Sequence, residues 1–140
     1  MATKRARDIM TGGAQCVQGH DSALDAARKL TELQVGALPI CGENNRLVGV
    51  VTDRDIVVKV LAKGLDPAEV ETGTLAQGEA VTIGADDDAE QVFNTMTQHK
   101  VRRLPVIDGT ALVGVVALAD AARALDAPDA GRLLEALSTD

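Results

Sequence analysis

Thr52 and Asp55 are two residues whose types and spacing suit them to bind a ribose. A carboxylate offers paired acceptors to the vicinal hydroxyls of a sugar, and a threonine hydroxyl can meet a nearby phosphate or sugar oxygen. Both follow an apolar run, Leu47 to Val51, and we expect them at a helix start, where free N–H groups and the helix dipole favour phosphate. The same Thr-x-x-Asp spacing is also that of a capping box, which closes a helix without any ligand.

A dense basic run, His99 to Arg103, lies in the interior of a chain whose formal net charge is −7. Arg102 or Arg103 can bind a phosphate through two parallel hydrogen bonds. The competing interpretation is a solvated strand end that offsets nearby acidic residues. Both arginines are therefore candidate ligand-binding residues.

Cys16, His20 and Cys41 form the other chemically distinctive set. Cys16 lies on the first expected strand and Cys41 ends the next, which a parallel crossover connection places beside it. A disulfide between them requires Cα atoms within about 7 Å. A zinc site would need His20 and a fourth ligand, Asp21 or a water molecule. We expect buried, reduced thiols, and we keep the disulfide and the zinc site as alternatives.

Sequence motifs of catalysis are missing from the chain. It contains no glycine-rich dinucleotide loop, no phosphate-binding loop with lysine, no nucleophile elbow and no paired-histidine zinc motif. The two histidines, His20 and His99, lie on different expected elements. We therefore predict a protein that is not an enzyme.

An internal repeat organises the whole chain. Residues Gly36–Ile40 and Leu47–Val51 recur as Arg102–Val106 and Leu112–Val116, at an offset of 66 residues for the first pair and 65 for the second. Self-similarity at a fixed period indicates two copies of one supersecondary unit.

Each copy is expected to contain a strand, an amphipathic helix, a hairpin and a closing helix. This β-α-β-β-α order predicts an α/β (α+β) fold in which a parallel strand pair is extended by an antiparallel strand. We place the first motif at residues 8–64, a linker at 65–79, the second motif at 80–126, and a C-terminal segment with a short helix at 127–140.

The two helices of each unit cover only one face of its sheet, so the other apolar face must pack against another part of the protein or a partner. The nearest partner of each is the other copy, so we expect the two motifs to pack about a pseudo-two-fold axis and to leave a cleft, where small molecules usually bind. The apolar helix faces further predict a homodimer.

The composition excludes several classes of partner. Phe93 is the single aromatic residue and the chain is acidic, which disfavours base stacking and phosphate backbones and so excludes a nucleic-acid binder. No apolar run reaches 18 residues and no secretory signal follows the basic N-terminus, so we expect no membrane span and a cytoplasmic protein.

Five segments together resemble one known family, the cystathionine-β-synthase (CBS) domain family, as a stand-alone tandem pair. Within that family the sequence of these motifs is most similar to the actinobacterial hypoxic-response CBS-pair type. The resemblance covers nearly the whole chain. It rests on Ala6–Thr11, Gly36–Ile40, Leu47–Asp55, Lys100–Val106 and Leu112–Asp120.

The resemblance implies a disc-like module, often dimerised, that senses adenosine-containing ligands such as AMP, ADP, ATP or S-adenosylmethionine. The family's pocket uses a glycine, a threonine and an aspartate in a fixed pattern, which this chain matches at Gly49, Thr52 and Asp55. Glycine within an apolar strand is also explained by a close approach of other backbone, so that alternative stays open for Gly49.

The second copy matches the pattern only in part. Gly114 and Asp120 are present, but Ala117 stands where the threonine should be, which implies one complete and one impaired site. Aliphatic side chains such as Val17 and Ile40 are expected to sandwich the adenine.

The leading hypothesis is therefore a non-enzymatic regulatory module that binds an adenosine-containing ligand in the cleft between its two CBS motifs. The alternative is a nucleotide-free structural or interaction module of a stress or hypoxia response. That module would carry a disulfide or metal lock at Cys16 and Cys41 and act on an unidentified protein partner.

Overall fold

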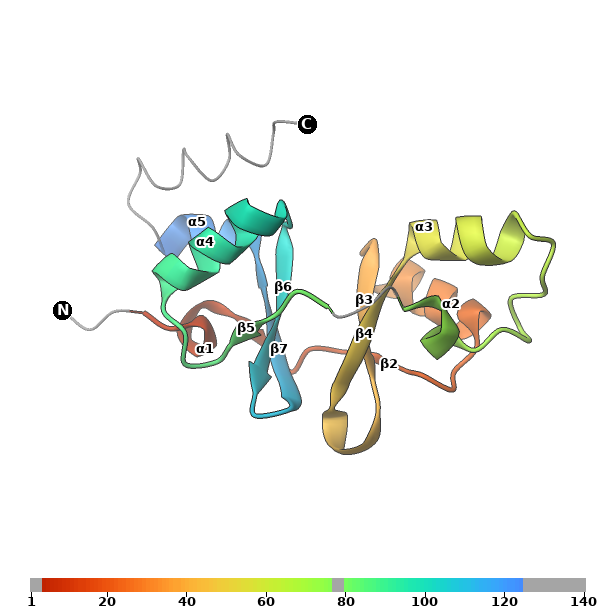
Figure 1. Cartoon of the computed structure of the whole chain (residues 1–140), viewed down its shortest axis with the longest axis horizontal. Coiled ribbons are helices and arrows are strands. Elements are labelled where there is room, and N and C mark those ends of the chain that lie inside the picture. The colour runs from red at the N-terminus through yellow and green to blue at the C-terminus, as the bar shows by residue number, and fades with distance from the viewer. Residues whose placement is uncertain (1–3, 77–79, 125–140) are drawn as a thin grey trace. The chain divides into compact units, whose positions relative to one another are not determined.

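The computed structural model describes residues 4–76 and 80–124, which fall into two compact units (Figure 1). The first-copy unit takes residues 15–80, and the second-copy unit takes residues 1–14 together with 81–140. Each unit contains a strand, a helix, a hairpin and a closing helix, so the predicted α/β fold with two motifs is confirmed.

The sheet of the first-copy unit has the strand order β2-β3-β4. Strand β2 (Val17–Gln18) pairs in parallel with β3 (Ala37–Cys41), which pairs antiparallel with β4 (Leu47–Thr52). The hairpin between β3 and β4 turns through the 3-10 helix η1 (Glu43–Asn45). This is the topology that a strand, crossover helix and hairpin require.

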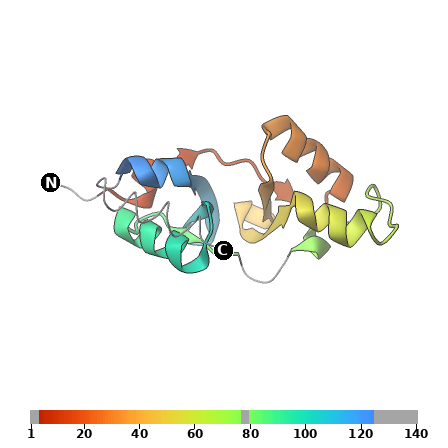
Figure 2. The same cartoon turned by 90° about the horizontal axis from the view of Figure 1, so that it is seen from above.

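Two helices pack on this sheet, as Figures 1 and 2 show from the side and from above. Helix α2 (Ala23–Leu33) begins where the Ser22 hydroxyl accepts a hydrogen bond from the Asp25 N–H at 3.0 Å. Helix α3 (Asp53–Ile56) continues directly into the π-helical turn η2 (Val57–Leu61).

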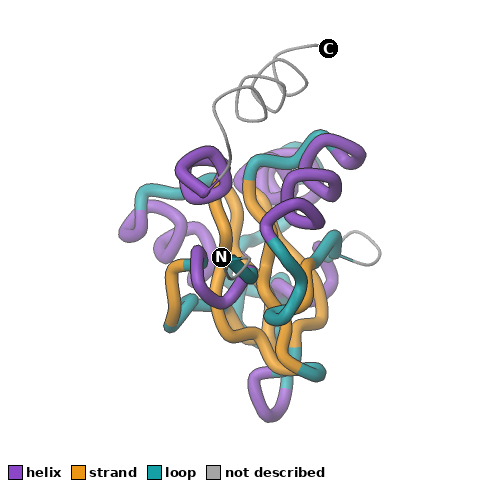
Figure 3. Tube along the Cα trace, turned by 90° about the vertical axis from the view of Figure 1, so that its left-hand side faces the viewer, coloured by secondary structure: helices purple, strands orange, loops and turns teal. Residues whose placement is uncertain are grey.

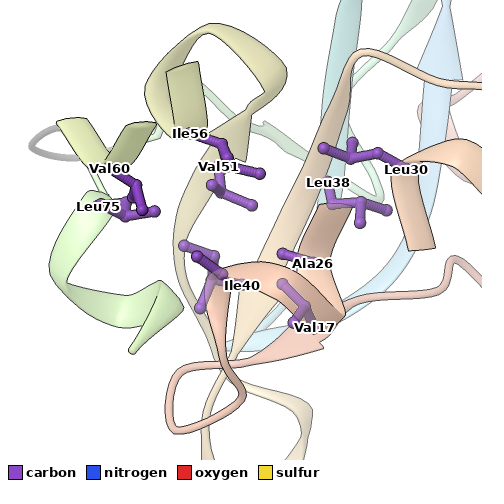
Figure 4. Close-up of a cluster of buried hydrophobic side chains, with 10 residues drawn as sticks. Val17, Ala26, Leu30, Leu38, Ile40, Val51, Ile56, Val60 and Leu75 are labelled. Atoms are coloured by element: carbon purple, nitrogen blue, oxygen red, sulfur yellow. The ribbon is translucent and has the colours of Figure 1, made fainter. Parts of the chain in front are cut away.

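The core of the first-copy unit is aliphatic, as expected for a chain with one aromatic residue (Figure 4). Full burial of each valine, leucine or isoleucine side chain contributes about 1.5–3 kcal/mol. The buried cluster comprises Val17, Ala23, Ala26, Leu30, Leu38, Ile40, Val51, Ile56, Val60 and Leu75.

The predicted linker is part of the first-copy unit as far as the structure describes it. Residues 72–75 form the 3-10 helix η3 (Thr72–Leu75), in which Thr72 is fully buried. The Thr72 N–H donates to the Asp21 carbonyl oxygen at 2.8 Å. The sequence predicts a linker here because the stretch is polar. Its packing depends on contacts with residues about fifty positions earlier, which local sequence does not show.

The sheet of the second-copy unit has four strands in the order β1-β7-β6-β5. Strand β5 (Ile83–Gly84) is parallel to β6 (Arg103–Asp108), and β7 (Ala111–Ala117) pairs antiparallel with both β6 and the short strand β1 (Thr11–Gly12). Figure 3 marks the strands in orange and the helices in purple.

Helices α4 (Ala89–His99) and α5 (Leu118–Ala124) accompany this sheet. Helix α4 begins with a capping box between Asp88 and Gln91. The buried cluster of this unit comprises Ala6, Ile83, Ala85, Val92, Met96, Leu104, Val106, Val116 and Ala121.

The N-terminal residues belong to the second-copy unit, whereas the sequence division assigned residues from 8 onward to the first motif. Helix α1 (Ala6–Ile9) places Ala6 in the second core, and the Ala6 N–H donates to the Asp87 carbonyl oxygen at 2.7 Å. Strand β1 then pairs with β7, with Thr11 opposite Val115. The reason is that β7 has an open edge that the strand hydrogen-bonds.

Ion pairs on the surface reinforce the attachment of α1. The Arg7 side chain donates to the Asp86 carboxylate at 2.9 Å, and Arg5 reaches the same oxygen at 3.4 Å. The hydrogen bond from Arg7 holds the pKa of the Asp86 carboxyl below its ordinary value and raises that of the Arg7 guanidinium. All three side chains are solvent-exposed, so each pair is weak.

Two glycines each let another chain segment, here called a lead-in segment, pack tightly on a hairpin. A Cβ added to Gly49 would lie 2.7 Å from the Ala76 Cβ, and one added to Gly114 would lie 2.7 Å from the Thr11 carbonyl oxygen. The lead-in segments are residues 72–76 and 6–12. Close approach of backbone is therefore a sufficient structural reason for both glycines.

The predicted C-terminal helix within 127–140 lies outside the described residues. In the part of the chain that the structure describes, no helix is long and apolar enough to cross a membrane.

We predict that Gly49→Ala lowers the free energy of unfolding by about 1–3 kcal/mol, because the new methyl group overlaps the Ala76 methyl group and forces the lead-in segment away. Urea denaturation followed by circular dichroism measures the loss. The matched control is Gly12→Ala, where a Cβ has nothing within 4 Å. Equal midpoints for the two variants would contradict the packing role of Gly49.

Candidate functional site

Thr52 and Asp55 form a reciprocal capping box at the junction of β4 and α3. The Thr52 N–H donates to Asp55 Oδ2 at 2.9 Å, and the Asp55 N–H donates to Thr52 Oγ1 at 3.0 Å. Thr52 is half-buried, whereas Asp55 is only 3% exposed. The capping interpretation of this spacing is thus realised in the structure.

Lys59 is the cation that compensates the buried Asp55 carboxylate. Its Nζ lies 3.5 Å from Asp55 Oδ1 and also donates to the Leu75 carbonyl oxygen at 3.1 Å. A buried carboxylate is strongly destabilising unless it is paired and hydrogen-bonded. Lys59 therefore links the candidate site to the lead-in segment that packs on Gly49.

The groups of the capping box are of types that also bind ligands. Each carboxylate oxygen has two lone pairs, and a threonine hydroxyl both donates and accepts. A carboxylate beside a hydroxyl is the combination of groups that hydrogen-bonds a sugar.

The second copy retains half of this arrangement. The Ala117 N–H donates to Asp120 Oδ2 at 2.9 Å, as the Thr52 N–H does to Asp55. The acceptor for the Asp120 N–H is missing because alanine has no hydroxyl. Asp120 Oδ1 accepts from Arg123 Nη2 at 2.6 Å, as Asp55 Oδ1 pairs with Lys59.

Arg102 and Arg103 lie beside this second-copy arrangement. Arg103 is directly opposite Ala117 in the β6–β7 register, and the Arg102 carbonyl oxygen accepts from the Leu118 N–H at 2.8 Å. Both arginines are exposed. Both arginines belong to the second-copy unit, as Asp120 does, whereas Thr52 and Asp55 belong to the first-copy unit.

Val17 and Ile40, predicted to sandwich an adenine, lie in the core of the first-copy unit. Their side chains are fully buried in the first core, where β2 and β3 place them in register with each other (Figure 4). Both side chains contribute to the core, and their contact with an adenine stays a prediction.

Cys16 and Cys41 form a disulfide with a Cα–Cα distance of 5.9 Å. Our expectation of reduced thiols is therefore wrong, and the disulfide alternative is the one the structure contains. His20 is exposed, with Nε2 3.9 Å from Asp21 Oδ1. Among the described residues no three histidine, cysteine or acidic side chains group as metal ligands, so the predicted zinc set of Cys16, His20 and Cys41 is not assembled.

Lys59 and Arg123 are the residues that sequence reasoning missed. Each pairs with the pattern aspartate of its copy, four residues after Asp55 and three residues after Asp120. This spacing places two side chains on one helix face, so it was the available signal.

A family model described as the CBS domain matches this chain twice, over residues 6–62 and 73–127. The two matches correspond to the two copies of the repeat. The first match begins with the segment that packs on the second hairpin, and the second match begins within the segment that packs on the first hairpin.

Curated relatives include Hypoxic response protein 1 of Mycobacterium tuberculosis. It is 48% identical over 120 residues, which cover 86% of this chain and 84% of that protein. The CBS domain-containing protein YhcV of Bacillus subtilis is 34% identical over 116 residues, or 83% of this chain and 81% of that protein.

Two solved structures are informative for ligands. Hypoxic response protein I, crystallised with two coordinated zinc ions, superposes with a TM-score of 0.79 at 46% identity and covers 88% of this chain and 100% of that one. CBSX2 in complex with AMP superposes with a TM-score of 0.74 at 27% identity and covers 86% of this chain and 95% of that one.

We predict that Thr52→Ala lowers the free energy of unfolding by about 1 kcal/mol, because the Asp55 N–H loses its acceptor. In the second copy, Ala117→Thr supplies the missing acceptor and should raise stability by a similar amount. Equilibrium denaturation in urea measures both variants. An unchanged midpoint for Thr52→Ala shows that the hydroxyl contributes nothing to capping.

Proposed function

The chain belongs to the CBS domain family as a tandem pair, and from that premise we propose that it is a non-enzymatic regulatory module for an adenosine-containing ligand. The ligand is AMP, ADP, ATP or S-adenosylmethionine, and Thr52 and Asp55 of the first copy hold its ribose. The observation that carries the proposal is the complete glycine, threonine and aspartate pattern of the first copy, which lies in one local structure at the end of β4.

The residues around Asp55 suit a ribose with phosphate. A carboxylate is a paired acceptor for the vicinal hydroxyls of a sugar. The half-buried Thr52 hydroxyl and the Lys59 ammonium, 3.5 Å from the same carboxylate, offer contacts to further oxygens. In the second-copy unit, Arg102 and Arg103 are exposed and available to phosphate.

The AMP complex of CBSX2 supports the ligand class, because that protein has the same fold at 27% identity. Zinc is not part of the proposal. The described residues of this chain contain no group of three metal ligands, and both cysteine sulfurs are bonded to each other.

Isothermal titration of the full chain with AMP, ATP and S-adenosylmethionine tests the proposal. We predict that at least one of the three binds with one site per chain, and that Thr52→Ala weakens binding about tenfold, the effect of losing one hydrogen bond of about 1.4 kcal/mol. Ala117→Thr completes the second pattern and is expected to raise the stoichiometry to two.

The matched control is Ser22→Ala, which removes a helix cap from the same unit but lies outside the pattern. It should lower stability as Thr52→Ala does and leave the affinity unchanged. Absence of heat and of a thermal shift with all three compounds would overturn the proposal.

A second candidate function is a nucleotide-free structural or interaction module locked by the Cys16–Cys41 disulfide. The observation that favours it is the disulfide itself, which ties β2 to β3 across a sequence separation of 25 residues. Closing a loop of this length stabilises a fold by about 3 kcal/mol, mainly by restricting the unfolded chain.

We predict that the native protein has no thiol that iodoacetamide alkylates, and that reduction exposes two and lowers the free energy of unfolding by about 3 kcal/mol. Mass spectrometry and urea denaturation measure the two effects. The Cys16→Ser/Cys41→Ser double variant is the control, since a reductant should leave it unchanged. Two alkylated thiols in the unreduced protein would eliminate the lock.

A further inference from the structure

The two sulfurs of the Cys16–Cys41 disulfide differ in their access to solvent. Cys16 is partly exposed and stands between the exposed Gln15 and the short strand β2, whereas Cys41 is the last residue of β3 and is fully buried. A disulfide opens when a thiolate attacks one of its two sulfurs, and access is one of the factors that decide which sulfur is attacked. In the folded protein an incoming thiolate therefore reaches Cys16.

Residue 16 lies at the margin of the first sheet. Strand β2 is the edge strand in the order β2-β3-β4, and its two residues pair with Ile40 and Cys41 of β3. Cys16 precedes the first of these pairs, so a group bonded to its sulfur does not interrupt the ladder. The neighbouring Val17 stays anchored in the first core, where it is 2% exposed. Opening of the disulfide at Cys16 thus does not require the core to open.

Lys29 places a positive charge at the accessible half of the disulfide. Its Nζ, on helix α2, donates a hydrogen bond to the Cys16 carbonyl oxygen at 2.8 Å. Within the described residues Lys29 forms no ion pair, so no carboxylate offsets its charge directly. An ammonium group in this position attracts an anionic thiolate.

The turn between β3 and β4 also lies beside the accessible sulfur. Oδ1 of Asn45, an exposed residue of η1, is 3.7 Å from Cys16 Sγ. Cys16 Sγ therefore lies among polar groups of α2 and η1, which tolerate a polar adduct better than an apolar core would.

The buried position of Cys41 makes it the leaving sulfur. A charge without a partner is costly inside a protein, so a thiolate is disfavoured at this fully buried residue. The Cys41 sulfur is therefore released as a thiol, with a proton taken from solvent.

We propose that Cys16 is a modification site, at which a low-molecular-weight aliphatic thiol forms a mixed disulfide with this protein. The thiolate sulfur bonds to Cys16 Sγ, the Cys16–Cys41 bond breaks, and its electron pair goes to Cys41 Sγ, which takes up the proton. One sulfur–sulfur bond replaces another, so the step consumes no further oxidant or reductant. The site does not depend on the ligand proposed at Thr52 and Asp55. Alkylation of the native protein tests whether the disulfide is closed, whereas the experiments below test where it opens.

Peptide mapping of the full chain treated with reduced glutathione tests the site of attack. The reaction is stopped in acid, the remaining thiols are blocked with N-ethylmaleimide in denaturant, and trypsin then separates Cys16 on residues 8–28 from Cys41 on residues 30–46. We expect glutathione on residues 8–28 and maleimide on residues 30–46, with at least about tenfold less of the reverse pattern. An equal distribution, or glutathione mainly on Cys41, would overturn the proposal.

Two single variants decide the same question if the wild-type disulfide closes again before it is trapped. Cys41→Ser leaves Cys16 as the thiol, and Cys16→Ser leaves Cys41. With oxidised glutathione, Cys41→Ser should form the adduct at least about tenfold faster than Cys16→Ser, because Cys41 reacts only after a local opening of β3. In urea the two rates should become equal, which attributes the difference to the fold. Equal rates without urea, in variants that circular dichroism shows to be folded, would contradict selective attack at Cys16.

Lys29→Gln tests the contribution of charge. It should slow the reaction of the disulfide with glutathione about threefold more than the reaction with 2-mercaptoethanol, which has no carboxylates, since this is the Coulomb effect of one charge several ångströms away in water. The matched control is Lys63→Gln, which removes an exposed lysine of the same unit and should leave the ratio of the two rates unchanged. A ratio that Lys29→Gln does not alter would remove Lys29 from the site.

Discussion

Each hairpin of this protein carries a glycine on its second strand, and a lead-in segment packs where a side chain would otherwise lie. At Gly49 the neighbour is Ala76, and at Gly114 the neighbours are Met10 and Thr11. Both approaches are too close for any Cβ, so the chain path through both units depends on them. The N-terminal segment can then complete the second sheet, and residues 72–75 can complete the first core.

The position of Asp55 in the candidate ribose site depends on the packing of residues 72–76 against the first hairpin. Asp55 is held by Thr52 on one side and by Lys59 on the other, and Lys59 also donates to the Leu75 carbonyl oxygen of the lead-in segment. A ligand that hydrogen-bonds Asp55 shares that carboxylate with Lys59. Binding can therefore change the stability of the lead-in segment, since a ligand shifts an equilibrium through differential affinity.

The two copies of the repeat have the same order of helices and strands but differ in their surface residues. The first copy has Thr52 at the cap and Val58 on its closing helix, where the second has Ala117 and Arg123. Neither substitution disturbs the strand order, because both positions lie at the end of the hairpin or on an exposed helix face. The two copies thus share a core architecture and differ in what they offer to ligands and partners.

The sequence by itself determined the repeat, the order of elements and the capping box at Thr52 and Asp55, because each depends on spacing within a few residues or on self-similarity. Tertiary structure alone decided that the N-terminal segment joins the second copy, that Cys16 and Cys41 are bonded, and that Thr72 is buried in the first-copy unit. These outcomes depend on which distant segments meet in space. The local sequence pattern does not show which distant segments pack together, because that depends on shape complementarity and burial across the whole unit.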